Sequence, residues 1–216
     1  LLKNTAAANI VALVRNESKA ADLKAKGIEL RHFDYDAPET LASALSGIDK
    51  LLLISANEVG RRTPQHKAVI DAAKQAGVPY IAYTSLLNAD TSPLGLAQEH
   101  RETERLIKDS GLKYTFLRNN WYSENYLGAV AHTVEIGTSY GAAGLGKISS
   151  ASRQDYAEAA AKVLTSEGHD HKTYELAGST SFTLADLARD IAEVSGKAVT
   201  YQNLTAEDYR HALLQA

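Results

Sequence analysis

Residues 50–85, KLLLISANEVGRRTPQHKAVIDAAKQAGVPYIAYTS, decide the fold, because they hold two apolar stretches separated by one amphipathic stretch. Residues 50–55 are the most apolar of the chain, and we expect a buried strand there, at the centre of its sheet. Residues 64–76 repeat apolar side chains at helical spacing, and residues 80–85 form the next expected strand. This strand–helix–strand order predicts parallel strands covered by helices.

The same alternation continues on both sides of this segment. Short apolar or β-branched runs predict further strands at residues 10–14, 28–33 and 114–118. Helical stretches lie between the strands, and Asn16 and Pro38 are placed to begin two of them. Right-handed crossovers then put the five strands in one sheet, which is the doubly wound, Rossmann-like α/β fold.

The second part of the chain lacks this regular alternation. Residues 137–146 are Gly-rich and irregular, and they are followed by an Ala-rich helix and two short strands. We expect a dinucleotide-binding domain in residues 1–120 and a smaller α+β substrate-binding lobe in residues 121–216. The short strands of this lobe are expected at residues 172–176 and 199–202.

The composition narrows the possible partners and compartments. The 216 residues carry a formal net charge of −3, so no general basic field favours nucleic acid or an anionic membrane. Cysteine is absent, which excludes disulfides, thiolate nucleophiles and cysteine metal ligands. No apolar run reaches the length needed to cross a bilayer. We expect a cytoplasmic protein with neither nucleic acid nor a membrane as partner, and its oligomeric state is left open.

The cofactor candidates are the residues just past each strand, because ligands of open α/β sheets bind beyond the carboxyl ends of the strands. Arg15 and Asn16 follow residues 10–14, and Lys19 lies one turn later. An acid at this position would bind the ribose 2′-hydroxyl of NAD, whereas a cation favours the 2′-phosphate of NADP. The sequence therefore predicts NADP(H), with the alternative that Arg15 is only a solvated cation at a strand end.

The ends of the next three strands supply further cofactor candidates. Small residues at the end of the strand expected at residues 50–55 allow a close approach of the cofactor. For Asp34, the alternative role is to cap an ordinary turn. The candidates on the adenine side are Asp34 and Tyr35. Those that line the cofactor are Ile54, Ser55 and Ala56, and those near nicotinamide are Thr84 and Ser85.

A dinucleotide site also needs a Gly-rich turn between a first strand and a helix, to hold the pyrophosphate. No such motif precedes Arg15, and Gly141, Gly144 and Gly146 come too late in the chain. Either this is not a nucleotide fold, or an opening strand–helix unit of about 20 residues lies outside this sequence. The chain begins with Leu rather than Met, and residues 1–8 read as the end of a helix, which favours the second interpretation.

Several segments resemble one family of proteins. The most specific of them is residues 117–126, LRNNWYSENY. The others are residues 14–16, 52–55, 83–87, 89–94 and 152–157. The sequence is similar to the NADPH-dependent quinone oxidoreductases of the NmrA-like group, which are atypical short-chain dehydrogenases/reductases. The likeness extends over essentially all 216 residues, and the family pattern continues beyond both ends of this sequence.

This resemblance implies NADPH-dependent reduction of quinones to quinols by hydride transfer. It places Arg15 at the 2′-phosphate and residues 54–56 along the cofactor. The loop around nicotinamide and substrate holds the remaining candidates, which are Asn119, Trp121, Tyr122, Ser123 and Glu124 for the cofactor and Trp121, Tyr122 and Asn125 for the quinone. Packing in the core is the alternative role for Tyr122 and Tyr126.

No general acid can be assigned from the sequence. None of the 11 tyrosines has Lys at the fourth following position, the pair that typical short-chain dehydrogenases use. His100 and Glu104 share one helical face, where we expect a surface ion pair. The hydroxyl of a quinol has a phenolic pKa of about 10, so the quinol anion formed by hydride transfer can take its proton from water. No metal site is expected, since the close pair His169 and His171 lies in a polar turn.

Two other functions stay open. A protein of this group can bind NADP(H) without turnover and act as a redox sensor through a protein partner, and the missing Tyr/Lys pair fits that function equally well. A sugar-nucleotide or isoflavone-type reductase would need a catalytic Lys or Tyr that the sequence does not place.

Overall fold

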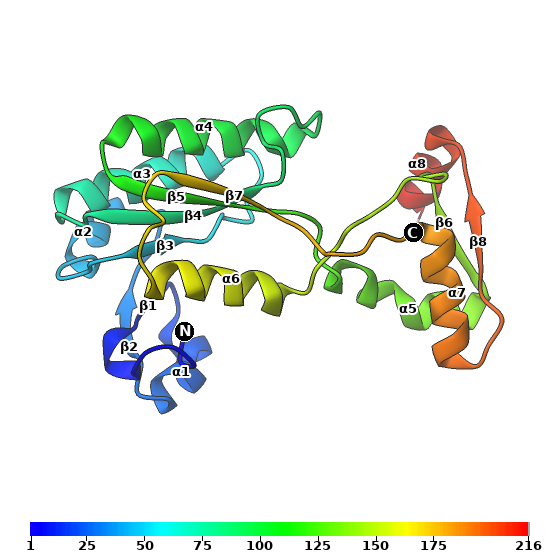
Figure 1. Cartoon of the computed structure of the whole chain (residues 1–216), viewed down its shortest axis with the longest axis horizontal. Coiled ribbons are helices and arrows are strands. Elements are labelled where there is room, and N and C mark those ends of the chain that lie inside the picture. The colour runs from blue at the N-terminus through cyan, green and yellow to red at the C-terminus, as the bar shows by residue number, and fades with distance from the viewer. Residues whose placement is uncertain (216) are drawn as a thin grey trace. The chain divides into compact units, whose positions relative to one another are not determined.

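The computed structural model describes residues 1–215, which form two units (Figure 1). The first unit contains Leu1–Asn119 and Tyr156–Leu176, and the second contains Asn120–Asp155 and the chain from Ala177 onward. The expected division at residue 120 therefore needs a correction, because the chain returns to the first unit after Asp155. Within the described residues, every helix is too short or too polar to pass through a bilayer.

A four-stranded parallel sheet forms the centre of the first unit. Its strand order is β3 (Leu51–Leu53), β4 (Tyr80–Leu86), β5 (Lys113–Asn119) and β7 (Lys172–Leu176). The expectation of a central strand at residues 50–55 is wrong, because β3 lies at the edge and β4 and β5 occupy the centre. Residues 172–176 were expected in the smaller lobe, but they pair with β5 and close the other edge.

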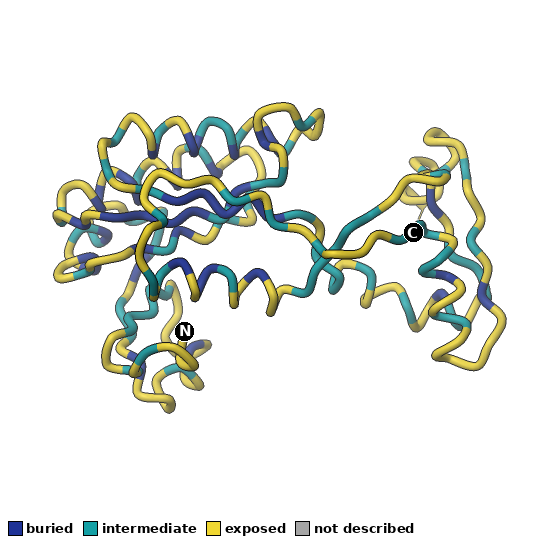
Figure 2. Tube along the Cα trace, viewed as in Figure 1, coloured by how far each residue is buried: buried dark blue, intermediate teal, exposed yellow. Residues whose placement is uncertain are grey.

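Helices cover both faces of this sheet. α3 (Arg62–Gln75) and α4 (Gly95–Ser110) pack on one face, where Val69, Ile107 and Phe116 belong to one buried cluster. α6 (Arg153–Thr165) covers the other face through Ala160 and Val163 (Figure 1). Between these two layers, β4 and β5 are the most deeply buried strands, whereas the edge strand β7 is largely exposed or half-buried (Figure 2). This arrangement follows from the apolar faces of the helices, which need a partner surface.

β1 (Val11–Val14) and β2 (Glu29–His32) form a separate two-stranded parallel sheet in the first unit. The expectation of one continuous sheet is therefore wrong. In the doubly wound strand order 3-2-1-4-5-6, one strand lies between the second and the fourth. No strand of residues 1–215 lies between β1 and β3, so no hydrogen-bonded ladder joins the two sheets. The short helical elements of this region are η1 (Ala7–Asn9), η2 (Glu17–Ala20), α1 (Ala21–Ala25), η3 (Pro38–Thr40) and α2 (Leu41–Ala44).

The second unit combines helices with a short parallel strand pair. Its elements are α5 (Glu124–Ile136), β6 (Thr138–Gly141), α7 (Leu184–Ser195), β8 (Thr200–Asn203) and α8 (Ala206–Gln215). β6 pairs with β8, although residues 137–146 were expected to be irregular. A Cβ atom at Gly141 would come within 2.9 Å of Leu184, so glycine lets this strand pack closely against α7. Gly141, one of the glycines that made this segment look irregular in the sequence, is thus part of the packing of β6.

Candidate functional site

A cavity of about 340 Å³ lies in the first unit, along the whole of β3 and beside the ends of β1 and β2. It brings together five residues predicted from the sequence, which are Arg15, Asp34, Tyr35, Ile54 and Ala56. These residues come from three different strand ends, as expected for a ligand site of an open α/β fold. Asn16 and Lys19 are exposed and do not line the cavity.

The connection after β1 presents one cation to the cavity. Arg15 is exposed, and its guanidinium forms no ion pair within residues 1–215. Asn16 caps η2, because its Oδ1 accepts hydrogen bonds from the backbone N and the Oγ of Ser18 at 3.0 and 2.6 Å. The Asn16 side chain therefore holds the turn, and Arg15 is the residue of this connection that can meet a phosphate.

The connection after β2 supplies an acceptor and an aromatic ring. The Oδ1 atom of Asp34 accepts a hydrogen bond from the backbone N of Asp36 at 3.1 Å, so the Asp-capped turn considered from the sequence is present. The same residue also lines the cavity. The ring of Tyr35 packs edge-on against Phe33 with 5.9 Å between the centroids, and burial raises the pKa of Tyr35. A neutral aromatic wall of this kind suits the flat base of a nucleotide.

Residues 54–61, which we call the β3–α3 loop, are held by His66. The backbone N of Ala56 donates to Nε2 of His66 at 2.9 Å, so the proton of the neutral ring is on Nδ1. Nδ1 lies 2.9 Å from Oγ1 of Thr103, and that hydroxyl donates to the backbone O of Glu99 at 2.8 Å. Burial lowers the pKa of His66 to about 4, with the Arg62 charge acting in the same direction. The ring is therefore neutral at pH 7 and keeps its acceptor for Ala56.

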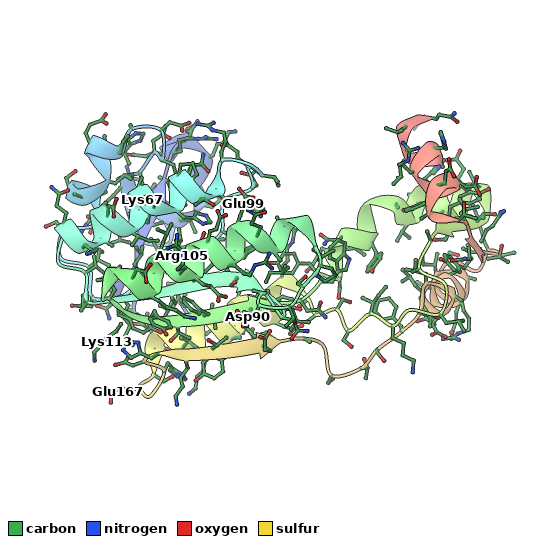
Figure 3. The ribbon with its side chains drawn as sticks, turned by 90° about the horizontal axis from the view of Figure 1, so that it is seen from above. Lys67, Asp90, Glu99, Arg105, Lys113 and Glu167 are labelled. Carbon is green, nitrogen blue, oxygen red and sulfur yellow. The ribbon has the colours of Figure 1, made fainter. Side chains whose placement is uncertain are left out.

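Glu99 of α4 holds the other end of the β3–α3 loop (Figure 3). Its Oε1 atom accepts hydrogen bonds from the backbone N atoms of Gly60 and Arg62 at 2.9 and 3.2 Å. The Nε atom of Arg62 donates to the backbone O of Ala56. Side chains of two helices thus hold this loop, and the loop carries Ile54 and Ala56 into the cavity wall.

Thr84 and Ser85, predicted to lie near nicotinamide, are both engaged in hydrogen bonds. Oγ1 of Thr84 accepts from the backbone N of Ser55 at 2.8 Å, so it links the ends of β3 and β4. Ser85 is buried, and its hydroxyl donates to Oε1 of Glu104 at 2.6 Å. We therefore expect these two side chains to position the strand ends, while direct contact with a cofactor stays a prediction.

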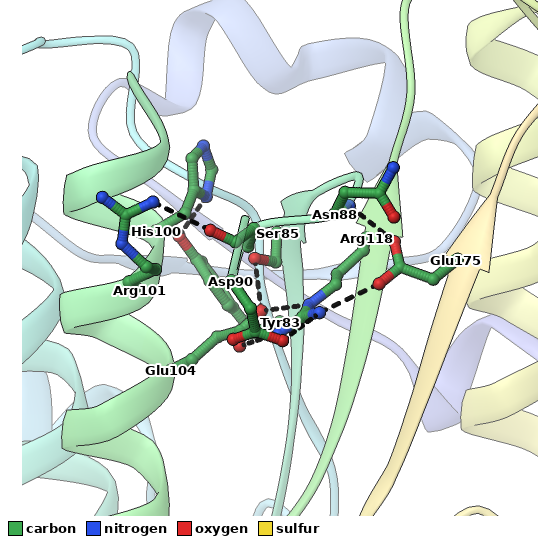
Figure 4. Close-up of polar contacts among 10 residues, drawn as sticks. Tyr83, Ser85, Asn88, Asp90, His100, Arg101, Glu104, Arg118 and Glu175 are labelled. Carbon is green, nitrogen blue, oxygen red and sulfur yellow. Dashed lines mark hydrogen bonds and ion pairs between the residues drawn. The ribbon is translucent and has the colours of Figure 1, made fainter. Parts of the chain in front are cut away.

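An ion cluster built on the buried pair Arg118 and Glu104 lies next to Ser85 (Figure 4). Arg118 of β5 binds Glu104 through two hydrogen bonds of 2.9 and 2.7 Å, and it also reaches Asp90 at 2.8 Å and Glu175 at 2.9 Å. Arg118 is 6% exposed and Glu104 is 2% exposed. Each buried charge is thus paired with good geometry, which buried charges require.

The expected surface ion pair between His100 and Glu104 is wrong. Both side chains are buried, and Nδ1 of His100 lies 2.7 Å from the hydroxyl of Tyr83. Burial lowers the pKa of His100 to about 4. Helical spacing placed the two residues correctly on one face, but that face of α4 packs on the sheet instead of meeting water.

The segment after β5 carries the remaining predicted residues. Asn119 ends β5, is 7% exposed, and accepts a hydrogen bond at its backbone O from the backbone N of Leu87 at 3.0 Å. The next residues belong to the second unit, where Trp121 is 49% exposed and Asn125 is also exposed. The predicted residues are therefore divided between the two units, and their grouping into one nicotinamide and quinone site stays a prediction.

Within the second unit, the residues after Trp121 are held by the start of α6. The carboxylate of Glu124 accepts from the backbone N of Arg153 at 2.9 and 3.0 Å, and the guanidinium of Arg153 lies 5.5 Å from the ring centre of Tyr122. The hydroxyls of Ser123 and Ser150 are 2.9 Å apart. Tyr126 packs edge-on against Phe182 with 6.0 Å between centroids, as in the core-packing alternative.

Comparison with known proteins identifies the family. The model of a family described as NAD(P)H-binding matches residues 1–167. The chain belongs to the NAD(P)H-binding family. This match contains every strand end that lines the cavity, and it confirms the Rossmann-like α/β fold predicted from the sequence.

Similar proteins of this family include reductases. Quinone oxidoreductase 2 of Escherichia coli (strain K12) is 58% identical over 213 residues, which are 99% of this chain and 74% of that protein. A crystal structure of the NADPH-dependent quinone oxidoreductase of Escherichia coli, complexed with NADPH, matches with a TM-score of 0.95 and 57% identity over 98% of this chain and 75% of that one. Triphenylmethane reductase of Citrobacter sp., complexed with NADP(H), matches with a TM-score of 0.93 and 38% identity over 100% and 76% of the two chains. The resemblance stated from the sequence is confirmed.

Two residues of the cavity wall could hold the adenosine half of the family's cofactor. Arg15, whose guanidinium forms no ion pair within residues 1–215, suits a phosphate, and the ring of Tyr35 suits a flat base. No residue among 1–215 is identified as a ligand of the pyrophosphate. No role was predicted from the sequence for Gln65, His66, Glu99 or Arg118. For Arg118 a signal exists, because a charged residue inside an apolar strand indicates a buried ion pair.

Proposed function

We propose that this protein is an NADPH-dependent reductase that converts quinones to quinols. The observation that carries the proposal is a cavity lined by Arg15, Asp34 and Tyr35, in which the Arg15 guanidinium has no ion pair among the described residues 1–215. The 58% identity to a quinone oxidoreductase over 99% of the chain supports the choice of substrate. The cytoplasmic location expected from the sequence is part of this proposal.

The residues of the first unit would bind and orient the adenosine end. Arg15 would hold the 2′-phosphate through charge-assisted hydrogen bonds, and Tyr35 would lie beside adenine. His66 and Glu99 would keep the β3–α3 loop in place, so Ile54 and Ala56 form a preorganised wall. When bound, NADPH supplies the hydride, that is, two electrons and one of the two hydrogens that turn a quinone into a quinol.

The second hydrogen reaches the product as a proton. No Tyr/Lys pair exists in the sequence, and the hydroxyl of Tyr83 is buried with its pKa raised by desolvation. The quinol anion, with a phenolic pKa of about 10, can take this proton from water. The exposed ring of Trp121 and the ring of Tyr122 would stack on the flat acceptor.

The decisive experiment mixes the full chain with NADPH and 1,4-benzoquinone and follows the near-ultraviolet absorbance of the reduced nicotinamide. We expect quinone-dependent loss of this absorbance, faster with NADPH than with NADH. Binding of NADPH without any loss would contradict the proposal and favour the redox sensor. Failure to bind NADPH at all would contradict both functions.

A further inference from the structure

The hydroxyl of Ser85 is held by a buried ion pair and is not available as a proton donor. Ser85 lies at the carboxyl end of β4, where the nicotinamide is expected, and is 5% exposed. It donates to Oε1 of Glu104 at 2.6 Å, and the same oxygen accepts from Nε of Arg118 at 2.9 Å. A carboxylate paired with a guanidinium only accepts. The single proton of the Ser85 hydroxyl is therefore directed toward α4 (Figure 4).

Tyr83 carries the other hydroxyl on this face of β4, and it is also engaged. Its oxygen lies 2.7 Å from Nδ1 of His100, and both side chains are buried under α4. Burial raises the pKa of the Tyr83 hydroxyl and lowers the pKa of His100 to about 4. A general acid works best when its pKa is close to the working pH, and neither group meets this condition near pH 7.

The remaining side chains at the end of β4 carry no acidic proton. Leu86 ends the strand, and Leu87 follows with its backbone N donating to the backbone O of Asn119 at 3.0 Å. Thr84 has an aliphatic hydroxyl, and such an alcohol is as weak an acid as water, with a pKa of about 16. Within the described residues, the end of β4 therefore offers no general acid to a substrate.

Hydride acceptors differ in whether they need a proton as the hydride arrives. An aldehyde or a ketone becomes an alkoxide, whose conjugate acid has a pKa of about 16, so an acid must protonate its oxygen during the transfer. A quinone becomes a quinol anion, which has a phenolic pKa of about 10 and is stable until water protonates it. A conjugated cation such as 10-methylacridinium becomes a neutral molecule and needs no proton.

We propose that this protein transfers a hydride without a coupled proton transfer, which restricts its acceptors to quinones and conjugated cations and excludes aldehydes and ketones. The nicotinamide gives two electrons and one hydrogen to the acceptor, and NADP⁺ forms. A quinone then takes one proton from water to become the quinol, whereas the cation is already neutralised by the hydride. The inference rests on the proposed function, because it takes NADPH as the donor and places the acceptor at the end of β4.

The test is a single turnover of the full chain loaded with NADPH and mixed with 1,4-benzoquinone, in ordinary and in heavy water. The rate should be constant from about pH 6 to about pH 8, with a solvent isotope effect of about 1, because no proton moves during hydride transfer. 10-Methylacridinium should also be reduced, at a rate that does not change with pH. 4-Nitrobenzaldehyde should oxidise no NADPH.

Two variants remove the phenols that are the alternative acids. Tyr83→Phe keeps the buried ring and loses the hydroxyl, and its rate with benzoquinone should stay within about twofold of the wild-type rate. Tyr122→Phe removes the one phenol among the residues predicted for the quinone, and its solvent isotope effect should equal that of the wild-type chain. The wild-type measurements decide by themselves if either variant does not fold.

Four results would overturn the inference. They are a rate that falls as the pH rises, a solvent isotope effect of about 2 or more, reduction of the aldehyde, and failure to reduce the acridinium. An isotope effect that Tyr122→Phe abolishes would identify that hydroxyl as the acid. In each of these cases oxidation of NADPH by benzoquinone leaves the proposed function standing, whereas a chain that benzoquinone does not oxidise would refute the proposed function itself.

Discussion

Replacing His66 by Gln should flatten the pH dependence of the free energy of unfolding. The Oε1 atom of Gln can accept from the backbone N of Ala56, as Nε2 of His66 does, but it takes up no proton. Burial lowers the pKa of His66 from the ordinary value of 6.5 to about 4. Between these two values the unfolded chain binds a proton that the folded chain does not, so stability rises with pH across this window.

The size of the pH effect follows from one proton, which the unfolded chain binds and the folded chain does not. A difference of one bound proton changes the free energy of unfolding by about 1.4 kcal/mol per pH unit. When the pH falls from about 7 to about 5, the titration of His66 alone should therefore lower the free energy of unfolding by about 2 kcal/mol. His100, whose pKa burial also lowers to about 4, adds a further loss in the same direction and is unchanged in the variant.

Urea unfolding at about pH 5 and about pH 7 measures this difference. His66→Gln should lose about 2 kcal/mol less than the wild-type chain on acidification. His132→Gln is the control, because that imidazole is 73% exposed. If His66→Gln and the wild-type chain lose equal stability on acidification, the histidine is not buried in the neutral form and the account of the β3–α3 loop is wrong.

Three further outcomes follow from the site. Arg15→Ala should weaken NADPH binding about ten- to a hundredfold and leave NADH binding nearly unchanged, since charge-assisted hydrogen bonds contribute about 1.5–3 kcal/mol; equal losses for both nucleotides in titrations would refute the 2′-phosphate assignment. Glu104→Gln should destabilise the fold by about 3 kcal/mol in urea unfolding at pH 7, because it removes the buried partner of Arg118; a change below about 0.5 kcal/mol would show that Asp90 and Glu175 suffice. Trp121→Ala should raise the KM for benzoquinone about three- to tenfold without changing the dissociation constant of NADPH; the reverse pattern would place Trp121 at the cofactor.

Local patterns in the sequence were enough to predict the fold class and one end of the site. The strand expected at residues 80–85 is β4, because apolar runs bounded by turns depend on neighbouring residues only. Arg15, Asp34 and Ile54 were found by the rule that ligands bind beyond the carboxyl ends of parallel strands, and they line one cavity. Such a rule needs the order of elements and no knowledge of their packing.

The order of strands in the sheets was decided only by the tertiary structure. β7 pairs with β5 across an intervening stretch that contains Asn120–Asp155 of the second unit, and β3 lies at an edge despite its apolar sequence. Hydrophobicity reports that a strand is buried, but burial under helices and burial between two strands leave the same pattern in the sequence.

The polar interior also depended on tertiary packing. Arg118 meets Glu104 and Glu175 from elements 14 and 57 residues away. His66 meets Thr103 at a separation of 37 residues, and Gln65 lines its cavity beside residues of β1 and β2. Sequence spacing defines which side chains share a helix face. Only packing against the sheet decides whether that face is exposed to water or buried. A carboxylate, an imidazole or an amide on a buried face must find a hydrogen-bond partner.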